Sequence, residues 1–119
     1  MKAEIKRYHS PDVSDLTKFK PENKKNFGFL LQVIVGIKGI ESEESFDLFV
    51  CTPQWFENNY SSSDVIIGEH FLIVFEYSFD RITNKISEYI NDLEEDNWDL
   101  LALKIDRIGK WEFRDYSLG

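Results

Sequence analysis

Cys51 is the residue whose type and position could most readily support nucleophilic chemistry. It is the only cysteine, and it ends an expected strand directly before Thr52-Pro53, a pair typical of a helix start. A helix N-terminus lowers the pKa of a thiol, but a catalytic thiol also needs a neighbouring base. The two histidines, His9 and His70, have no sequence context that indicates a base. We therefore expect Cys51 to be a small buried side chain at a strand end.

Metal and carboxylate chemistry have weak signals in this sequence. Two distant histidines and one cysteine match no zinc spacing. The acidic stretch 41–47 lacks the alternating frame and the glycine of a calcium loop. A glycine-rich phosphate cradle and a G-x-S-x-G elbow are also missing. The sequence therefore predicts no catalytic residue, no metal and no cofactor.

Composition favours one globular domain over residues 1–119. Apolar residues make up 42% of the chain and aromatic residues 15%, which is enough for a core and argues against disorder. A single cysteine cannot form an internal disulfide. The stretch MKAEIKRYHS has no apolar region for export, and no apolar run approaches the roughly 18 residues of a membrane span. We expect a cytoplasmic protein.

Charge points to the kind of partner. The net charge of −8 disfavours nucleic acid and anionic membranes, which need basic contacts, and favours a protein with a basic surface. Residues 1–38 carry eight Lys/Arg against four Asp/Glu, a net of +4, whereas residues 39–119 carry six against eighteen, a net of −12. We therefore expect any contact with a basic partner to come from the second region.

Two groups of acidic residues in that region are the candidate contacts. One surrounds an expected hairpin and comprises Glu41, Glu43, Glu44 and Asp47. The other lies between two expected helices and comprises Asp92, Glu94, Glu95, Asp96 and Asp99. Each of these residues taken singly is more often a solvated surface charge. Negative charge at a helix N-terminus is also favourable by itself.

The hydrophobic pattern predicts an α+β fold. Strands are expected at 1–8, 27–35, 44–51 and 70–77, and residues 110–113 are expected to form a short closing strand or an extended tail. The apolar run 70–77 predicts a central strand, and residues 11–26 predict a long surface loop. Helices are expected after Thr52-Pro53, at 79–94, and from a cap at Asp96-Asn97 to a stop at Gly109. These elements predict a four- to five-stranded sheet, mainly antiparallel or mixed, with two or three helices largely on one face.

The segment ESFDLFVCTPQWF is expected to be architectural. Phe46, Leu48 and Val50 fall on one face of a strand, which we expect to be the core face. Thr52 and Pro53 would begin a helix that Trp55 and Phe56 hold against the sheet, and Trp111 belongs to the closing strand in the same structural set. Asp47, in mid-strand, is expected to be exposed on the open face or held by a partner.

Five segments together resemble the immunity protein 8 family of bacterial polymorphic toxin systems. They are MKAEIKRYHSPDV, NFGFLLQVIVG, EESFDLFVCTPQWF, FLIVFEY and RIGKWEF. They occur in the same order over nearly the whole chain, and ESFD…VCTP-x-W is the most specific. Phe56 stands where many relatives have Leu.

The resemblance implies a cytoplasmic antidote that binds and blocks a cognate toxin domain, and it implies no catalytic residues. An alternative is a small enzyme or ligand-binding domain with a pocket near Cys51, Asp47 and His70. A third is a structural subunit of a larger assembly. The sequence indicates neither the toxin nor the oligomeric state.

Overall fold

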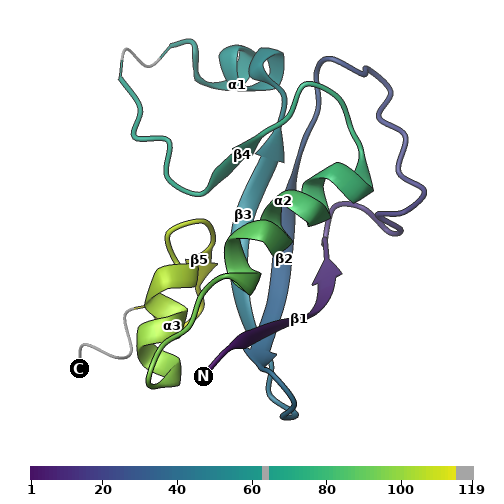
Figure 1. The fold of residues 1–119 in the computed structure, drawn as a ribbon. Helices are drawn as coiled ribbons and strands as arrows, with labels where there is room; N and C mark the ends of the chain where they lie inside the picture. Colours follow the sequence, from purple (N-terminus) through teal and green to yellow (C-terminus); the bar gives the residue numbers. More distant parts are fainter. Residues whose placement is uncertain (63–64, 115–119) are drawn as a thin grey trace.

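The computed structural model describes residues 1–62 and 65–114, which form a mixed five-stranded sheet with three helices (Figure 1). The strands are β1 (Ala3–His9), β2 (Gly28–Ile37), β3 (Glu44–Cys51), β4 (Phe71–Ile73) and β5 (Lys110–Trp111). The helices are α1 (Pro53–Tyr60), α2 (Phe79–Asn91) and α3 (Trp98–Ile105). The expected α+β class is confirmed, and the sheet is mixed.

The three long strands form an antiparallel meander with β2 in the middle. Side chains alternate between the two faces of a strand, and Phe46, Leu48 and Val50 share one face of β3, where each is at most 3% exposed. The register places the buried β2 side chains Val33, Leu31 and Phe29 opposite them. We call this side of the sheet the core face.

Helices α2 and α3 contribute to the core on this face (Figure 1). Both begin at a polar cap: the side chain of Ser78 accepts a backbone N–H at the start of α2, and that of Asn97 does so for α3. Intervals of three and four residues then bury Ile82, Ile86 and Ile90 in α2, and Leu101, Ala102 and Ile105 in α3. None of the helices in the described residues is long and apolar enough to cross a bilayer.

The end of α3 differs from the expectation, because the helix ends at Ile105 and Gly109 is not its stop residue. The backbone N–H groups of Ile108 and Gly109 both bond to the carbonyl oxygen of Ile105 in the turn that follows. Gly109 instead lies against β3, where an added Cβ would be 3.2 Å from the carbonyl carbon of Phe46. The glycine therefore allows the close approach that brings β5 beside β3.

β4 corrects the prediction of a long central strand over residues 70–77. It has only three residues, lies at the edge of the sheet and pairs parallel to β3, with Phe71 opposite Phe49 and Ile73 opposite Cys51. One edge of β3 is taken by β2, and β5 pairs with the other edge further along at Phe46. β4 therefore occupies only the remaining end of that second edge.

α1 packs on the opposite side of the sheet, which we call the open face. The Oγ1 of Thr52 accepts the N–H of Trp55 at 3.3 Å as an N-cap, and Pro53 is the first helical residue. The indole of Trp55 lies so close over Gly28 that an added Cβ would be 2.8 Å from it. Its ring centroid is also 4.6 Å from that of Phe49. Because Gly28 and Phe49 alternate with core-face residues, α1 covers one end of the open face.

The long segment between β1 and β2 packs against the core. Val13 is 8% exposed, and Leu16 and Phe19 contact the buried cluster. The ring of Phe19 lies 4.9 Å, centroid to centroid, from that of Tyr77. This long loop is therefore held by its own apolar side chains.

Candidate functional site

Cys51 does not form a nucleophile–base pair. Its side chain is 0% exposed, and burial raises the pKa of the thiol to about 11. Such a thiol is almost fully protonated near neutral pH and is a poor nucleophile. The candidate base is engaged elsewhere, because Nε2 of His70 lies 2.6 Å from the backbone oxygen of Asp106. The geometry therefore gives no support to a catalytic site at Cys51.

Asp47, the mid-strand carboxylate, is half-buried on the open face. Its Oδ1 accepts the hydroxyl of Ser45 at 2.7 Å. The register places it between Gln32 of β2 and Lys110 of β5. Asp47 is thus held by its own strand and faces polar neighbours on both sides.

The other acidic residues of the hairpin are spread over several local contacts. Glu43 forms an ion pair with Arg7 of β1 at 3.2 Å. Glu44 accepts the indole N–H of Trp111 at 2.7 Å, and Glu41 is exposed. Since two of these three carboxylates already have partners within the chain, the hairpin offers less free negative charge than its sequence indicates.

The second acidic group forms the connection between α2 and α3. Within it, Glu95 is half-buried and forms an ion pair with Lys104, while the backbone of Glu94 bridges to Lys2 beside β1. The group also includes four exposed carboxylates, which we call the α2–α3 acidic segment: Asp92, Glu94, Asp96 and Asp99. The described residues provide no ion pair for any of these four. This segment is therefore the main concentration of unpaired negative charge among the candidates.

Phe46 and Trp111 hold β5 against β3. They are 1% and 3% exposed, and their rings are stacked with centroids 6.5 Å apart. The register pairs the same two residues across the strands. Phe46 and Trp111 thus contact the core. Thr52 likewise has a structural contact, because it caps the start of α1.

The open face carries a cluster of aromatic rings of which the sequence indicated only part, the packing of Trp55 and Phe56 against the sheet. The members are Phe49, Trp55, Phe56, Tyr60 and Phe71, and neighbouring centroids are 4.6 to 6.1 Å apart. All five side chains are only half-buried, and α1 has no fully buried residue. We call this group the open-face aromatic cluster. The only sequence signal for the cluster as a whole was the aromatic content of residues 49–60.

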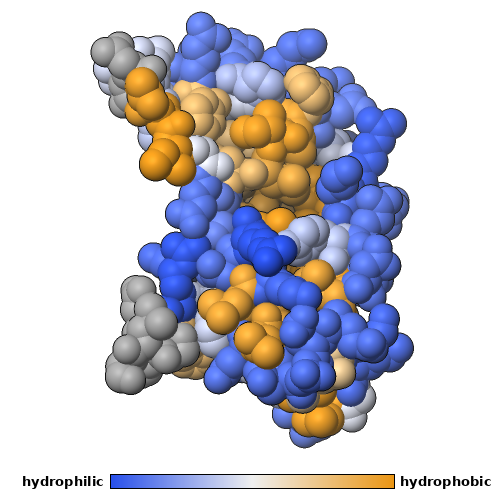
Figure 2. Space-filling view, turned by 60° about the vertical axis from the view of Figure 1, so that its left-hand side comes forward, coloured by the Kyte–Doolittle hydropathy of each residue, from blue (hydrophilic) through white to orange (hydrophobic). Residues whose placement is uncertain are grey.

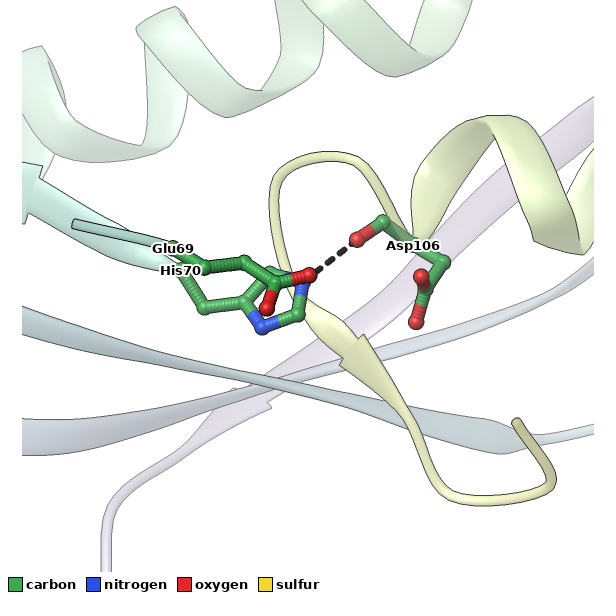
Figure 3. A group of neighbouring side chains, drawn as sticks. All are labelled: Glu69, His70 and Asp106. Atoms are coloured by element: carbon green, nitrogen blue, oxygen red, sulfur yellow. Dashed lines mark hydrogen bonds and ion pairs between the residues drawn. The ribbon is translucent and has the colours of Figure 1, made fainter. Parts of the chain in front are cut away.

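Four polar side chains meet where the end of α3 approaches the residues before β4, and we call them the C-terminal clasp. Nη2 of Arg114 donates both to Oδ2 of Asp106 and to Oε1 of Glu69, with N–O distances of 2.6 Å each. The 2.6 Å contact of His70 Nε2 with the Asp106 carbonyl requires a proton on Nε2 (Figure 3). Burial alone would raise the pKa of Asp106. The hydrogen bonds from Arg114 and from the Trp111 N–H outweigh burial and hold that pKa below its ordinary value.

Three members of the clasp raise the question of a metal ion, because Glu69, His70 and Asp106 present ligand-type atoms within 4.8 Å of one another. The guanidinium of Arg114 is already ion-paired with both carboxylates, and Nε2 of His70 is a donor to a carbonyl. A divalent cation would have to displace Arg114, whose positive charge would repel it. These residues fit an ion-pair network better than a metal centre.

The clasp also fixes an unusual backbone conformation. His70 has a φ of 64°, which is uncommon for a residue with a side chain. Glu69 and Arg114 are 45 residues apart, so no motif spacing indicated the network. The clasp ties the residues around β5 to the start of β4.

Comparison with known proteins identifies the family of the chain. Neither the search of curated proteins nor that of solved structures gave a match. A family model described as Immunity protein 8 matches residues 3–116, which run from the start of β1 to beyond the C-terminal clasp. Because this match covers nearly all of the 119 residues, the chain belongs to the immunity protein 8 family.

Proposed function

We propose that this protein is a cytoplasmic antidote that binds the toxin domain of a cognate bacterial polymorphic toxin and blocks it. The observation that carries the proposal is the family match over residues 3–116. An immunity protein acts by binding, so it needs a complementary surface more than reactive groups. The partner would be the toxin domain, and binding would inhibit its activity.

The distribution of reactive groups supports binding over catalysis. The thiol of Cys51 is buried and protonated, and Asp47 is bonded to Ser45. His70 and Asp106 belong to the C-terminal clasp. The groups best suited to chemistry are thus engaged in holding the fold.

The α2–α3 acidic segment supports a partner with a basic surface. Its four carboxylates are exposed and unpaired among the described residues, in a chain of net charge −8. Charge complementarity speeds encounter with a basic protein. If the toxin is a nuclease, its basic cleft would accept carboxylates in place of phosphates.

The direct experiment uses the toxin domain encoded beside this protein, with its active site inactivated. The two purified proteins should form a 1:1 complex that weakens as salt is raised, because the attraction between exposed charges is screened. The active toxin domain should lose activity in proportion to added antidote. Failure of a folded toxin domain to bind would overturn the antidote proposal.

A charge-reversal pair tests the acidic surface separately. Asp92→Lys with Asp96→Lys changes the net charge by +4, and so does the control pair Glu22→Lys with Glu57→Lys at exposed positions elsewhere. The first pair should weaken toxin binding by about tenfold or more, mainly by slowing association. Equal affinities of the two double variants would remove the α2–α3 acidic segment from the interface.

A further inference from the structure

The outer side of β4 is an unpaired edge of the sheet. β4 ends the strand order, and among the described residues only β3 pairs with it. The carbonyl of His70 accepts a backbone bond from β3, and the N–H of Val74 donates one back. The alternation of a parallel ladder therefore turns the N–H and C=O groups of Phe71 and Ile73 away from β3. Such an edge is a template for another extended chain.

A groove follows this edge. One hollow of about 300 Å³ lies between the chain from Leu72 to Glu76 and the first turns of α2. A second hollow of about 290 Å³ continues it towards Ile108, and Leu72 and Lys85 line both. Its walls include the apolar side chains of Ile82 and Ile86. The groove is thus wide enough for side chains and lies beside free backbone groups.

Apolar side chains of β4 and of the chain segments that precede and follow it are unusually exposed. Val65 and Ile67 are each 88% exposed, Phe75 is 80% exposed and Ile73 is 45% exposed. Figure 2 shows hydrophobic side chains gathered on the upper part of the molecule, where Figure 1 places α1, β4 and the segment between them. Apolar surface concentrated in this way marks a contact surface.

The groove is cationic although the chain as a whole is acidic. Its lining includes Arg81, Lys85 and Arg107. The adjoining hollow of about 540 Å³ beside Phe75 is lined by the three lysines Lys20, Lys24 and Lys25. These six side chains are a large share of the 14 Lys/Arg in the chain, so this side carries a local excess of positive charge.

The carboxylates that face the same groove cancel only the charge of Arg81 among these six side chains. Glu69 is paired with Arg114, and Glu76 is paired with Arg81 at 3.1 Å. Lys85, Arg107 and the three lysines have no ion pair among the described residues. The occupant that complements this groove is an extended chain with apolar side chains and acidic residues.

We propose that the outer edge of β4 receives an extended, acidic and apolar segment of the cognate toxin, which joins the sheet as an additional strand. This inference rests on the proposed function and names the mode of contact. Backbone groups of Phe71 and Ile73 supply the pairing, while side-chain pockets supply the selectivity. Alternate toxin side chains would lie over Leu72 towards α2, or beside Phe71 and the open-face aromatic cluster.

Charge distinguishes this occupant from a second copy of the chain. Two copies paired edge to edge would bring Lys85 and Arg107 of each near the same residues of the other, which is repulsive. A toxin segment with Asp or Glu at those positions is attracted instead. Nucleic acid is disfavoured because it does not pair with a free strand edge. The net charge of −8 on the chain would also repel its phosphates.

The first test removes a backbone donor from the edge. Ile73→Pro removes an outward N–H, and proline is tolerated in an edge strand at such a position. Its matched control, Ile73→Val, keeps the N–H and a β-branched side chain. With the inactivated toxin domain as the probe, Ile73→Pro should raise Kd by about tenfold or more, and Ile73→Val should bind like the unmodified protein.

The second test changes only charge. Lys85→Glu with Arg107→Glu should raise Kd by about tenfold or more, whereas Lys18→Glu with Lys38→Glu, the same net change at exposed positions outside the groove, should have little effect. Hydrogen exchange provides an independent readout, because the amides of Phe71 and Ile73 should become protected in the complex.

The outcomes separate this inference from the antidote proposal. If the toxin binds Ile73→Pro and the groove charge variants as tightly as the unmodified protein, the edge is not the contact and the antidote proposal stands. If the protein alone is a dimer that Ile73→Pro dissociates, a second copy occupies the edge and the inference is wrong. If folded toxin does not bind the unmodified protein at all, both proposals fail.

Discussion

β2 and β4 carry similar apolar runs but have opposite places in the fold. β2 lies between two partners, and residues such as Leu31 and Val35 are 2% and 0% exposed. Within residues 1–62 and 65–114, β4 has a partner on one side only, and its Ile73 is 45% exposed. The same kind of sequence thus builds the core in one place and an exposed edge in the other. Apolar residues that the chain leaves uncovered are the ones we assign to a partner.

The two strands are also held by different forces. β2 is stabilised by burial between its neighbours and the helices of the core face. The start of β4 is held in part by polar contacts, because Glu69 and His70 bind Arg114 and Asp106 in the C-terminal clasp. The comparison predicts that β2 responds to loss of apolar volume, whereas β4 responds to loss of charge.

The largest effect is expected for Leu31→Ala in β2. Removing this 2% exposed side chain leaves a cavity and should lower the free energy of unfolding by about 2–5 kcal/mol. Ile73→Ala in β4 should lower it by less than about 1 kcal/mol, because much of that side chain is already in water. Urea unfolding followed by tryptophan fluorescence measures both. Equal losses would contradict the contrast between the strands.

Cys51 reports whether β4 stays in place, because it lies opposite Ile73 in the parallel pairing. With the pKa of its thiol raised to about 11 by burial, its reaction with a thiol reagent near neutral pH should be at least about a hundredfold slower than in the unfolded chain. The rate is measured with a chromogenic disulfide with and without urea. Fast reaction in the native state would mean that β4 opens readily, and would revive the reactive-cysteine alternative.

Asp106→Asn should weaken the clasp in a pH-dependent way. Above the ordinary Asp pKa of about 4, the variant should be less stable by about 1–2 kcal/mol, since it loses the charged hydrogen bonds to Arg114. The pKa of Asp106 is lowered in the fold. The extra stability of the unmodified protein is therefore lost as pH falls through that lowered pKa and the carboxyl group becomes neutral. Urea unfolding at several pH values measures the difference.

The control for the clasp is Asp92→Asn at an exposed position of the α2–α3 acidic segment. It should change stability by less than about 0.5 kcal/mol at neutral pH. The difference in the free energy of unfolding between Asp106→Asn and the unmodified protein should shrink at strongly acidic pH. If it stayed constant, the charge of the carboxylate would not be the source of the stabilisation.

The smallest effect is expected for Phe75→Ser beyond the end of β4. This side chain is 80% exposed, so its loss should change stability by less than about 0.5 kcal/mol. The same variant should weaken toxin binding if the edge is the contact surface. A loss of stability comparable with that of Leu31→Ala would mean that Phe75 belongs to the core.

Local sequence signals predicted most of the fold. The caps at Thr52 and Asn97, and the three- and four-residue intervals in α2, depend on neighbours within a few positions, and the structure contains each of them. The length and place of β4 were not predictable in this way. They depend on β5 taking part of the same edge of β3, at Phe46, and that competition involves residues more than sixty positions apart.

The candidate site was less predictable for the same reason. Composition indicated acidic residues, but whether a carboxylate is free depends on distant partners, such as Trp111 for Glu44 and Arg7 for Glu43. The cationic groove joins residues from the first loop, α2 and the end of α3. The average charge of −8 concealed it, because a net charge does not describe where the charges lie.

The parallel pairing of β3 with β4 has a consequence for how the protein is made. β2 and β3 are joined by the short turn 38–43, whereas β4 can pair only after the whole crossover 52–70 has closed. The clasp that holds the start of β4 further requires residues 106–114. On the ribosome, the meander can therefore assemble while β4 is still unanchored. A newly synthesised chain would acquire its core early and the edge at β4 last, so the surface that we propose to bind the toxin would form after the core has folded.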